Sequence, residues 1–186
     1  MKVQRICAKI IRNCTRHGDV RFIQDEETKS KVLLITAINV ATCYITTPKS
    51  PTGSLGIRLP IFVMIIENLN QYLSFVITIL DDMNIRRRFR FCNYVKDSKI
   101  DIYSYSAPLC LNRDWNQLIF DLEKFTENVF QTKYFQTIRI QIHANCKLRR
   151  IYFCDKVYDD NSLPKEYRVN FAKIVGQKTK NIIKWI

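Results

Sequence analysis

The chain contains little glycine, proline or histidine, and each of these shortages excludes a class of protein. With 4 Gly and 5 Pro among 186 residues, it lacks the composition of low-complexity, disordered segments. Its only two histidines are His17 and His143, so a nucleophile activated by a histidine base has few positions available. The longest apolar run, residues 61–66, is far shorter than the roughly 20 residues that span a bilayer. A disordered protein and a helical membrane protein are therefore disfavoured.

The seven cysteines also lack a recognisable metal or disulfide pattern. Their number is odd and no Cys-x-x-Cys pair occurs, which disfavours a zinc ribbon and a secreted disulfide framework. We expect reduced thiols, as in cytosolic and nuclear proteins. The sequence predicts no metal site and no cofactor.

What the chain has in abundance is positive charge. Lys and Arg number 30 against 17 Asp and Glu, which gives a net charge of +13. Such a charge draws a protein to acidic surfaces without indicating its fold. Three classes of partner fit this charge: nucleic acid, an anionic membrane face, and an acidic protein polymer such as tubulin.

Alternating apolar residues predict many short strands. Residues 73–80 place Leu73, Phe75, Ile77 and Ile79 on one face, and residues 115–122 and 138–142 repeat this period of two. Only residues 122–130 and a turn near residues 163–167 look helical. Many short strands with few helices between them predict an all-β fold, namely an antiparallel β-sandwich or jelly roll with one or two short helices.

A length of 186 residues corresponds to about one domain. We expect a basic N-terminal arm over residues 1–20, a single β-sandwich domain over residues 21–170, and a basic and apolar C-terminal extension over residues 171–186. The arm carries several basic residues and no acidic one before Asp19. This pattern also resembles a mitochondrial transit peptide, but a surface arm leading into the first strand is the interpretation that we favour.

Basic residues in three predicted strands are the best candidates for a binding surface. Strand periodicity places Arg86, Arg88 and Arg90 on one face and Phe89 on the other. Like charges side by side repel each other unless an anion meets them, and arginine forms bidentate bonds with carboxylates and phosphates. We therefore favour a binding surface over a solvated sheet face. The candidates for contact with a partner are Arg86, Arg88, Arg90, Arg139, Lys147, Arg149 and Arg150.

Signs of catalysis or metal binding are weak. His143 and Cys146 are the one pair that suggests a Cys–His dyad, and we favour a plain strand-edge histidine instead. Asp81 and Asp82 suggest a cation site, but the residues after them supply too few further oxygen ligands, so a hairpin turn is favoured. We expect no enzymatic activity.

Four blocks of sequence carry a resemblance to a known family. They cover residues 55–69, 80–94, 115–126 and 138–155, and the last, which reads IRIQIHANC and then LRRIYF, is the sharpest. From about residue 12 to about residue 168, the chain closely resembles the cilia- and flagella-associated protein 20 family. Differences around residues 96–105 and at both ends indicate a diverged paralogue within it.

The resemblance implies a compact β-sandwich of jelly-roll type without enzymatic activity. It implies a structural microtubule inner protein at the inner junction of axonemal doublet microtubules, which joins the B-tubule to the A-tubule and supports ciliary, flagellar and sperm motility. The implied partners are α/β-tubulin and other inner-junction proteins such as the Parkin co-regulated protein, with no membrane partner. The implied location is the axoneme, with the basal body or the nucleus as further sites.

Two alternatives stay open. A nucleic-acid-binding or nuclear regulatory module fits the charge, since arginine-rich strands with aromatic residues between them are typical of single-strand binding surfaces. A carbohydrate-binding module is suggested by fold analogy alone. It would need an exposed aromatic platform, for which Trp115 is the candidate.

Overall fold

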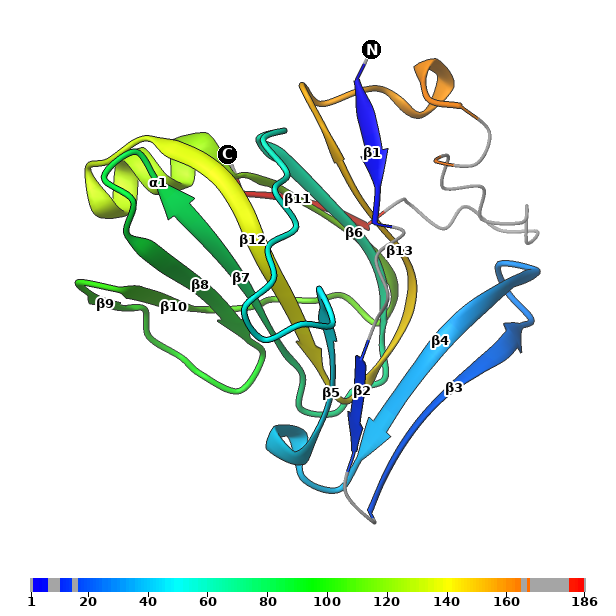
Figure 1. Cartoon of the computed structure of the whole chain (residues 1–186). Coiled ribbons are helices and arrows are strands. Elements are labelled where there is room, and N and C mark those ends of the chain that lie inside the picture. Colours follow the sequence, from blue (N-terminus) through cyan, green and yellow to red (C-terminus); the bar gives the residue numbers. More distant parts are fainter. Residues whose placement is uncertain (1, 7–10, 15–16, 165–166, 168–180, 186) are drawn as a thin grey trace.

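The computed structural model describes residues 2–6, 11–14, 17–164, 167 and 181–185. It confirms the predicted fold class, because two β-sheets pack face to face as a sandwich (Figure 1). Within these residues, no helix combines the length and the apolar character that crossing a membrane requires.

The first sheet, which we call sheet A, has its strands in the order β14-β11-β6-β13-β4-β3, and β1 also pairs with β13. Its pairings are antiparallel except for β14, which runs parallel to β11. Both ends of the chain thus contribute a strand, β1 and β14, while residues 171–180 of the expected extension lie outside the described residues. The strands are β1 (Val3–Arg5), β3 (Gly18–Asp25), β4 (Ser30–Ala37), β6 (Ile61–Asn68), β11 (Asp114–Asp121), β13 (Cys146–Cys154) and β14 (Asn181–Trp185).

The second sheet, sheet B, has the order β2-β5-β12-β7-β8-β10-β9, with β10 parallel to β8. Residues 40–47 begin with the short 3-10 helix η1 (Val40–Thr42), at whose N-cap the Asn39 side chain accepts a hydrogen bond from the Ala41 N–H. A second such helix is η2 (Asp160–Ser162). The strands are β2 (Ile11–Cys14), β5 (Cys43–Thr47), β7 (Ser74–Asp81), β8 (Arg86–Cys92), β9 (Lys99–Asp101), β10 (Ser104–Pro108) and β12 (Tyr134–His143).

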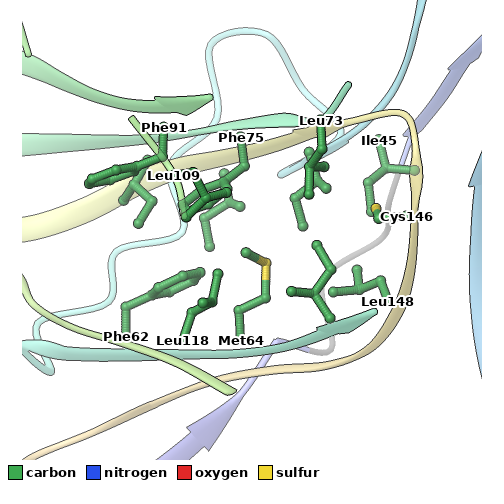
Figure 2. Close-up of a cluster of buried hydrophobic side chains, with 14 of the residues drawn as sticks. Ile45, Phe62, Met64, Leu73, Phe75, Phe91, Leu109, Leu118, Cys146 and Leu148 are labelled. Carbon is green, nitrogen blue, oxygen red and sulfur yellow. The ribbon is translucent and has the colours of Figure 1, made fainter. Parts of the chain in front are cut away.

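The core lies between the two sheets and follows the predicted alternation. Phe75, Ile77 and Ile79 of β7 are fully buried, and Figure 2 shows Phe75 facing side chains of sheet A such as Phe62 and Met64. Full burial of such a side chain contributes about 1.5–3 kcal/mol. The hydrophobic face of each strand therefore sets which residues remain on the outer faces.

The loop between β7 and β8 is the predicted hairpin turn. One carboxylate oxygen of Asp81, Oδ1, accepts the N–H of Met83 at 3.1 Å and that of Ile85 at 2.7 Å. Asn84 has a left-handed φ of 60°, a conformation that asparagine tolerates better than most residues. One oxygen of the Asp81 carboxylate thus serves the turn, and the other, Oδ2, pairs with Arg87 at 2.8 Å.

Helix α1 (Leu122–Phe130) has the predicted bounds and closes one end of the core. Its N-cap is Asp121, whose side chain accepts the N–H of Lys124, and its C-cap is Gln131 in a left-handed conformation. Phe125 on this helix packs edge-on against Phe89 of β8 with ring centroids 5.5 Å apart. The helix thereby anchors the inner face of β8.

Among the described residues, Cys43 differs from the expected reduced thiol. Cys92, Cys110, Cys146 and Cys154 are free, whereas Cys43 is disulfide-bonded. The prediction of reduced thiols is therefore wrong for Cys43. Spacing along the chain could not reveal this bond, because a disulfide depends on which strands become neighbours in space.

Candidate functional site

A groove of about 790 Å³ runs over the outer face of sheet B. Its floor consists of residues from β7, β8, β10 and β12, which lie side by side in Figure 1, and the loop of residues 51–54 forms part of its lining. Among the described residues that line it, none is Asp or Glu. The groove is therefore an electropositive surface on a strongly basic chain.

Three of the predicted contact residues stand together in this groove. Arg86, Arg88 and Arg90 are exposed at alternate positions of β8, and Phe89 and Phe91 between them are buried in the core. The strand alternation predicted for this segment is thus confirmed. The alternation along β8 is set by Phe89 and Phe91, because their burial places the side chains on the opposite face of the strand in solvent.

Arg88, the middle arginine of the three, lies between two residues with short side chains. In the strand register, Arg88 lies beside Thr78 of β7 on one side and Ser104 of β10 on the other. Within the described residues, no carboxylate forms an ion pair with Arg86, Arg88 or Arg90. Arg88 therefore remains accessible to an anion from outside, whereas Arg86 lies beside Leu80 and Arg90 beside Val76 and Ser106.

Arg90 differs from the other two in having a phenol partner. Its Nη2 donates a hydrogen bond to the Tyr94 hydroxyl at 2.9 Å. Burial alone would lower the pKa of Arg90, but this hydrogen bond and the nearby Tyr94 and Cys92 groups together raise it. The guanidinium is therefore charged at every physiological pH and held in a fixed direction at one end of the groove.

Arg139 also lines the groove, but the protein uses its hydrogen-bond donors internally. The guanidinium donates to the carbonyl oxygens of Pro48 at 3.1 Å, Ser50 at 2.6 Å and Pro51 at 2.9 Å. It therefore holds the loop that forms one wall of the groove. These hydrogen bonds position the wall, and contact of Arg139 with a partner stays a prediction.

The predicted isoleucine face of β12 is interrupted beside Arg139. A register shift occurs between Thr137 and Arg139, and Ile138 lines the groove, whereas Ile140 and Ile142 belong to the core. A β-bulge of this kind redirects one side chain. All three isoleucines are buried as predicted, although Ile138, at the bulge, also lines the groove.

The remaining predicted residues lie on β13 of sheet A, outside the groove. Lys147 is 3.1 Å from a carboxylate oxygen of Asp25 and 2.9 Å from one of Glu67. Burial would lower the pKa of Lys147, but the hydrogen bonds that it donates to these two carboxylates raise it. Arg149 is half-buried, and burial lowers its pKa. Arg150 lies over the Tyr167 ring, 5.7 Å from its centroid.

The possible Cys–His dyad is not assembled. The His143 ring lies with Nδ1 3.1 Å from the Val40 carbonyl oxygen and Nε2 2.9 Å from the Gln141 amide nitrogen. The Cys146 sulfur instead lies 3.8 Å from the backbone carbonyl oxygen of His143. Burial raises the pKa of this thiol far above its usual range, so Cys146 is not a nucleophile.

The groove also lacks an aromatic platform. No Phe, Tyr or Trp is among its lining residues, and Trp115 is only 2% exposed and packs with Val32 and Ile65. The exposed pair Tyr72 and Tyr94 lies in loops and is tilted by 59°, so it presents no flat surface. Neither base stacking nor sugar stacking is supported at this site.

A second hollow, of about 1020 Å³, lies among loops near Tyr72 and Asn145. Its amide side chains already bond the backbone: Asn145 accepts from the Ala37 N–H at 2.7 Å, and Asn93 accepts from the Leu73 N–H at 2.8 Å. The side chains of Asn145 and Asn93 thus stabilise the loops through hydrogen bonds within the protein. The arginine groove is therefore the stronger candidate.

Sequence reasoning missed two parts of the groove. The serines of β10 flank the arginines, although nothing in the sequence indicates that β10 pairs in parallel with β8. The loop of residues 51–54 is held by Arg139 through hydrogen bonds that nothing in the sequence indicates. Both depend on contacts between segments far apart in the chain.

Comparison with known proteins identifies the family to which the chain belongs. The CFA20 domain matches residues 3–171. The chain belongs to the CFA20 domain family. This match confirms the resemblance seen in the four sequence blocks. Strand β14 lies beyond the matched range.

Three curated relatives similar to this chain are named cilia- and flagella-associated protein 20. The protein of Chlamydomonas reinhardtii is 44% identical over 153 residues, which cover 82% of this chain and 80% of the relative. That of Paramecium tetraurelia is 44% identical over 154 residues, covering 83% and 81%. That of Caenorhabditis elegans is 42% identical over 162 residues, covering 87% and 79%. These names support a role in the cilium or flagellum.

Proposed function

We propose that this chain is a structural microtubule inner protein at the inner junction of axonemal doublet microtubules. There it joins the B-tubule to the A-tubule and supports ciliary and flagellar motility, including that of sperm. Its proposed partners are α/β-tubulin and other inner-junction proteins such as the Parkin co-regulated protein. The proposal is supported by the relatives' names together with one structural observation, a groove that presents arginines and no acidic side chain.

The proposed mechanism is electrostatic and mechanical. Tubulin surfaces are acidic, and a chain with a net charge of +13 is steered toward them. Each exposed ion pair contributes only about 0–1 kcal/mol. A repeating lattice multiplies such contacts, because neighbouring sites raise the effective concentration of the bound protein. No step in this role requires a catalytic group.

Arg86, Arg88 and Arg90 carry the proposed tubulin contact. Arg139 acts through the loop that it holds, and Lys147 has its charge neutralised by the fold. Arg149 and Arg150 belong to the other sheet, so they would contact a second surface if they contact the lattice at all.

The test is the location of the tagged chain in a ciliated cell. We expect the natural sequence in the axoneme and expect the triple variant Arg86→Glu, Arg88→Glu, Arg90→Glu to be lost from it. A matched control reverses three exposed charges outside the groove: Lys99→Glu, Arg113→Glu, Lys124→Glu. Equal retention of both variants would remove the β8 face from the proposal. Nuclear accumulation of the natural sequence would favour the nucleic-acid alternative.

A further inference from the structure

We infer that the groove on sheet B binds an extended acidic peptide segment whose carboxylates occur at every second residue. The inference deepens the proposed function, on which it rests for the statement that the partner is an acidic protein. It adds the shape and the charge spacing of the segment that enters the groove.

The spacing of the arginines is that of an extended chain. Alternate residues of a strand are about 6.7 Å apart, and Arg86, Arg88 and Arg90 occupy three such positions on one face of β8. An extended ligand lying along β8 has the same spacing between its own alternate side chains. Three carboxylates in an alternating sequence therefore meet three guanidinium groups in register, whereas three consecutive carboxylates do not.

The positive charge of the groove favours the binding of an anion. Three cations stand within one sheet face, and the lining supplies no carboxylate to neutralise them. Adjacent like charges destabilise a sheet, so an acidic ligand both gains ion pairs and relieves this repulsion. Bidentate pairing between guanidinium and carboxylate groups adds direction to the attraction.

The dimensions and polarity of the groove fit a peptide. Its volume of about 790 Å³ lies within the roughly 300–1,000 Å³ typical of ligand sites. Ser104 and Ser106 border the arginines on one side, and the loop held by Arg139 lines another part. Gln136, also in the lining, offers an amide that can bond a peptide group of the ligand.

Among the described lining residues there is no Phe, Tyr or Trp, which favours a peptide over a nucleic acid. Single-stranded nucleic acids gain about 1–3 kcal/mol for each base stacked on an aromatic ring. In this groove Phe89 and Phe91 are buried beneath the arginines and have no exposed face. A carboxylate peptide needs no such platform.

Fluorescence anisotropy of the full chain with labelled peptides tests the inference. The probe is an eight-residue peptide with Glu at every second position and Ser between. Controls are a peptide of the same composition with all Glu residues contiguous, the alternating peptide with Gln for Glu, and a deoxythymidine oligonucleotide of equal charge. At 0.15 M ionic strength, where screening acts over about 8 Å, we expect the alternating peptide to bind about tenfold more tightly than its contiguous isomer.

Variants locate the site. Arg88→Gln should weaken binding of the alternating peptide about tenfold, since one charge-assisted contact is lost. The triple variant Arg86→Gln, Arg88→Gln, Arg90→Gln should abolish the preference for the alternating order. Arg113→Gln removes one exposed charge outside the groove and should leave the affinity within about twofold. Circular dichroism checks that each variant is folded.

Three outcomes overturn the inference. Equal affinity for both peptide orders would mean that net charge alone attracts the ligand. Tighter binding of the oligonucleotide would assign the groove to nucleic acid. Failure of every peptide to bind, in a chain that still enters the axoneme, would reject the peptide site and leave the proposed function standing. Peptide binding by a chain that never enters the axoneme would instead reject the proposed function alone.

Discussion

The outer face of β8 and the start of β13 carry similar basic residues in different electrostatic environments. On β8, Arg86 and Arg88 are exposed in a groove without an acidic side chain. On β13, Lys147 lies within ion-pair distance of both Asp25 and Glu67. A cation that the fold already neutralises has little charge left for a partner, so the β8 group is the one available to an anion.

The two faces of β8 repeat this contrast within one strand. Arg87 points into the sandwich, where its Nε lies 2.8 Å from Oδ2 of Asp81 and its guanidinium lies over the Phe130 ring. Arg86 and Arg88 on either side of it point outward. The pleat of the strand therefore decides which arginine stabilises the fold and which can bind a partner.

Replacing Arg87 by Met should have the largest effect on stability. The change leaves the buried Asp81 without its cation, and breaking a buried ion pair from one side costs about 3–5 kcal/mol. Arg88→Met, one position away, should change the free energy of unfolding by less than about 0.5 kcal/mol, because that side chain is exposed. Urea denaturation measures both. Similar losses in the two variants would contradict the distinction between the faces.

Lys147→Met should have the next largest effect. The side chain is 23% exposed, so its loss should lower the free energy of unfolding by about 1–2 kcal/mol, less than that of a fully buried pair. Burial raises the pKa of Glu67 by more than its interactions with Lys147 lower it. Without Lys147, the carboxylates of Glu67 and Asp25 repel each other. The double variant Lys147→Met, Glu67→Gln should therefore recover part of the loss. The exposed Lys124→Met is the control.

The same ion pairs predict how stability depends on acid. Burial would raise the pKa of Asp25 above its ordinary value of 3.8, but hydrogen bonds from Thr28 and Lys147 outweigh burial and lower it. Because the folded pKa is lowered, the stabilisation is present above the unfolded pKa and is lost as pH falls through the folded pKa. Thermal unfolding below about pH 4 should show this loss. Asp25→Asn should show a shallower decline, and an unchanged slope would contradict the assignment.

Much of the fold could be predicted because the alternation of apolar residues and the helix cap are visible in short stretches of sequence. Buried alternation in residues 73–80 and 86–92 identifies two strands and their faces, and helix α1 has the predicted bounds because Asp121 caps it. The family resemblance added what local pattern does not contain, namely a connection with cilia and flagella, and the matched relatives support it.

The distinction between free and neutralised cations could not be predicted. Lys147 meets Asp25 across 122 residues of sequence, and Arg139 meets the Pro51 carbonyl across 88. Which acid lies beside which base follows from the order of strands in a sheet, and a single sequence does not reveal that order. Sequence therefore located every candidate cation, and the fold separated those that are exposed from those that are internally paired.

His143 offers the smallest and most local test of the groove. Burial lowers its pKa, the Val40 carbonyl opposes that shift, and Arg90 lowers the pKa further. Because the folded pKa lies below the ordinary value of 6.5, the stabilisation from neutral His143 is present above pH 6.5 and is lost as pH falls through the folded pKa. An acidic peptide beside Arg90 offsets the charge of that guanidinium, so NMR titration should give His143 a higher pKa with the peptide bound. His17, which lies outside the groove, supplies the control resonance. An unchanged His143 titration at saturating peptide would mean that the ligand does not reach the Arg90 end of β8.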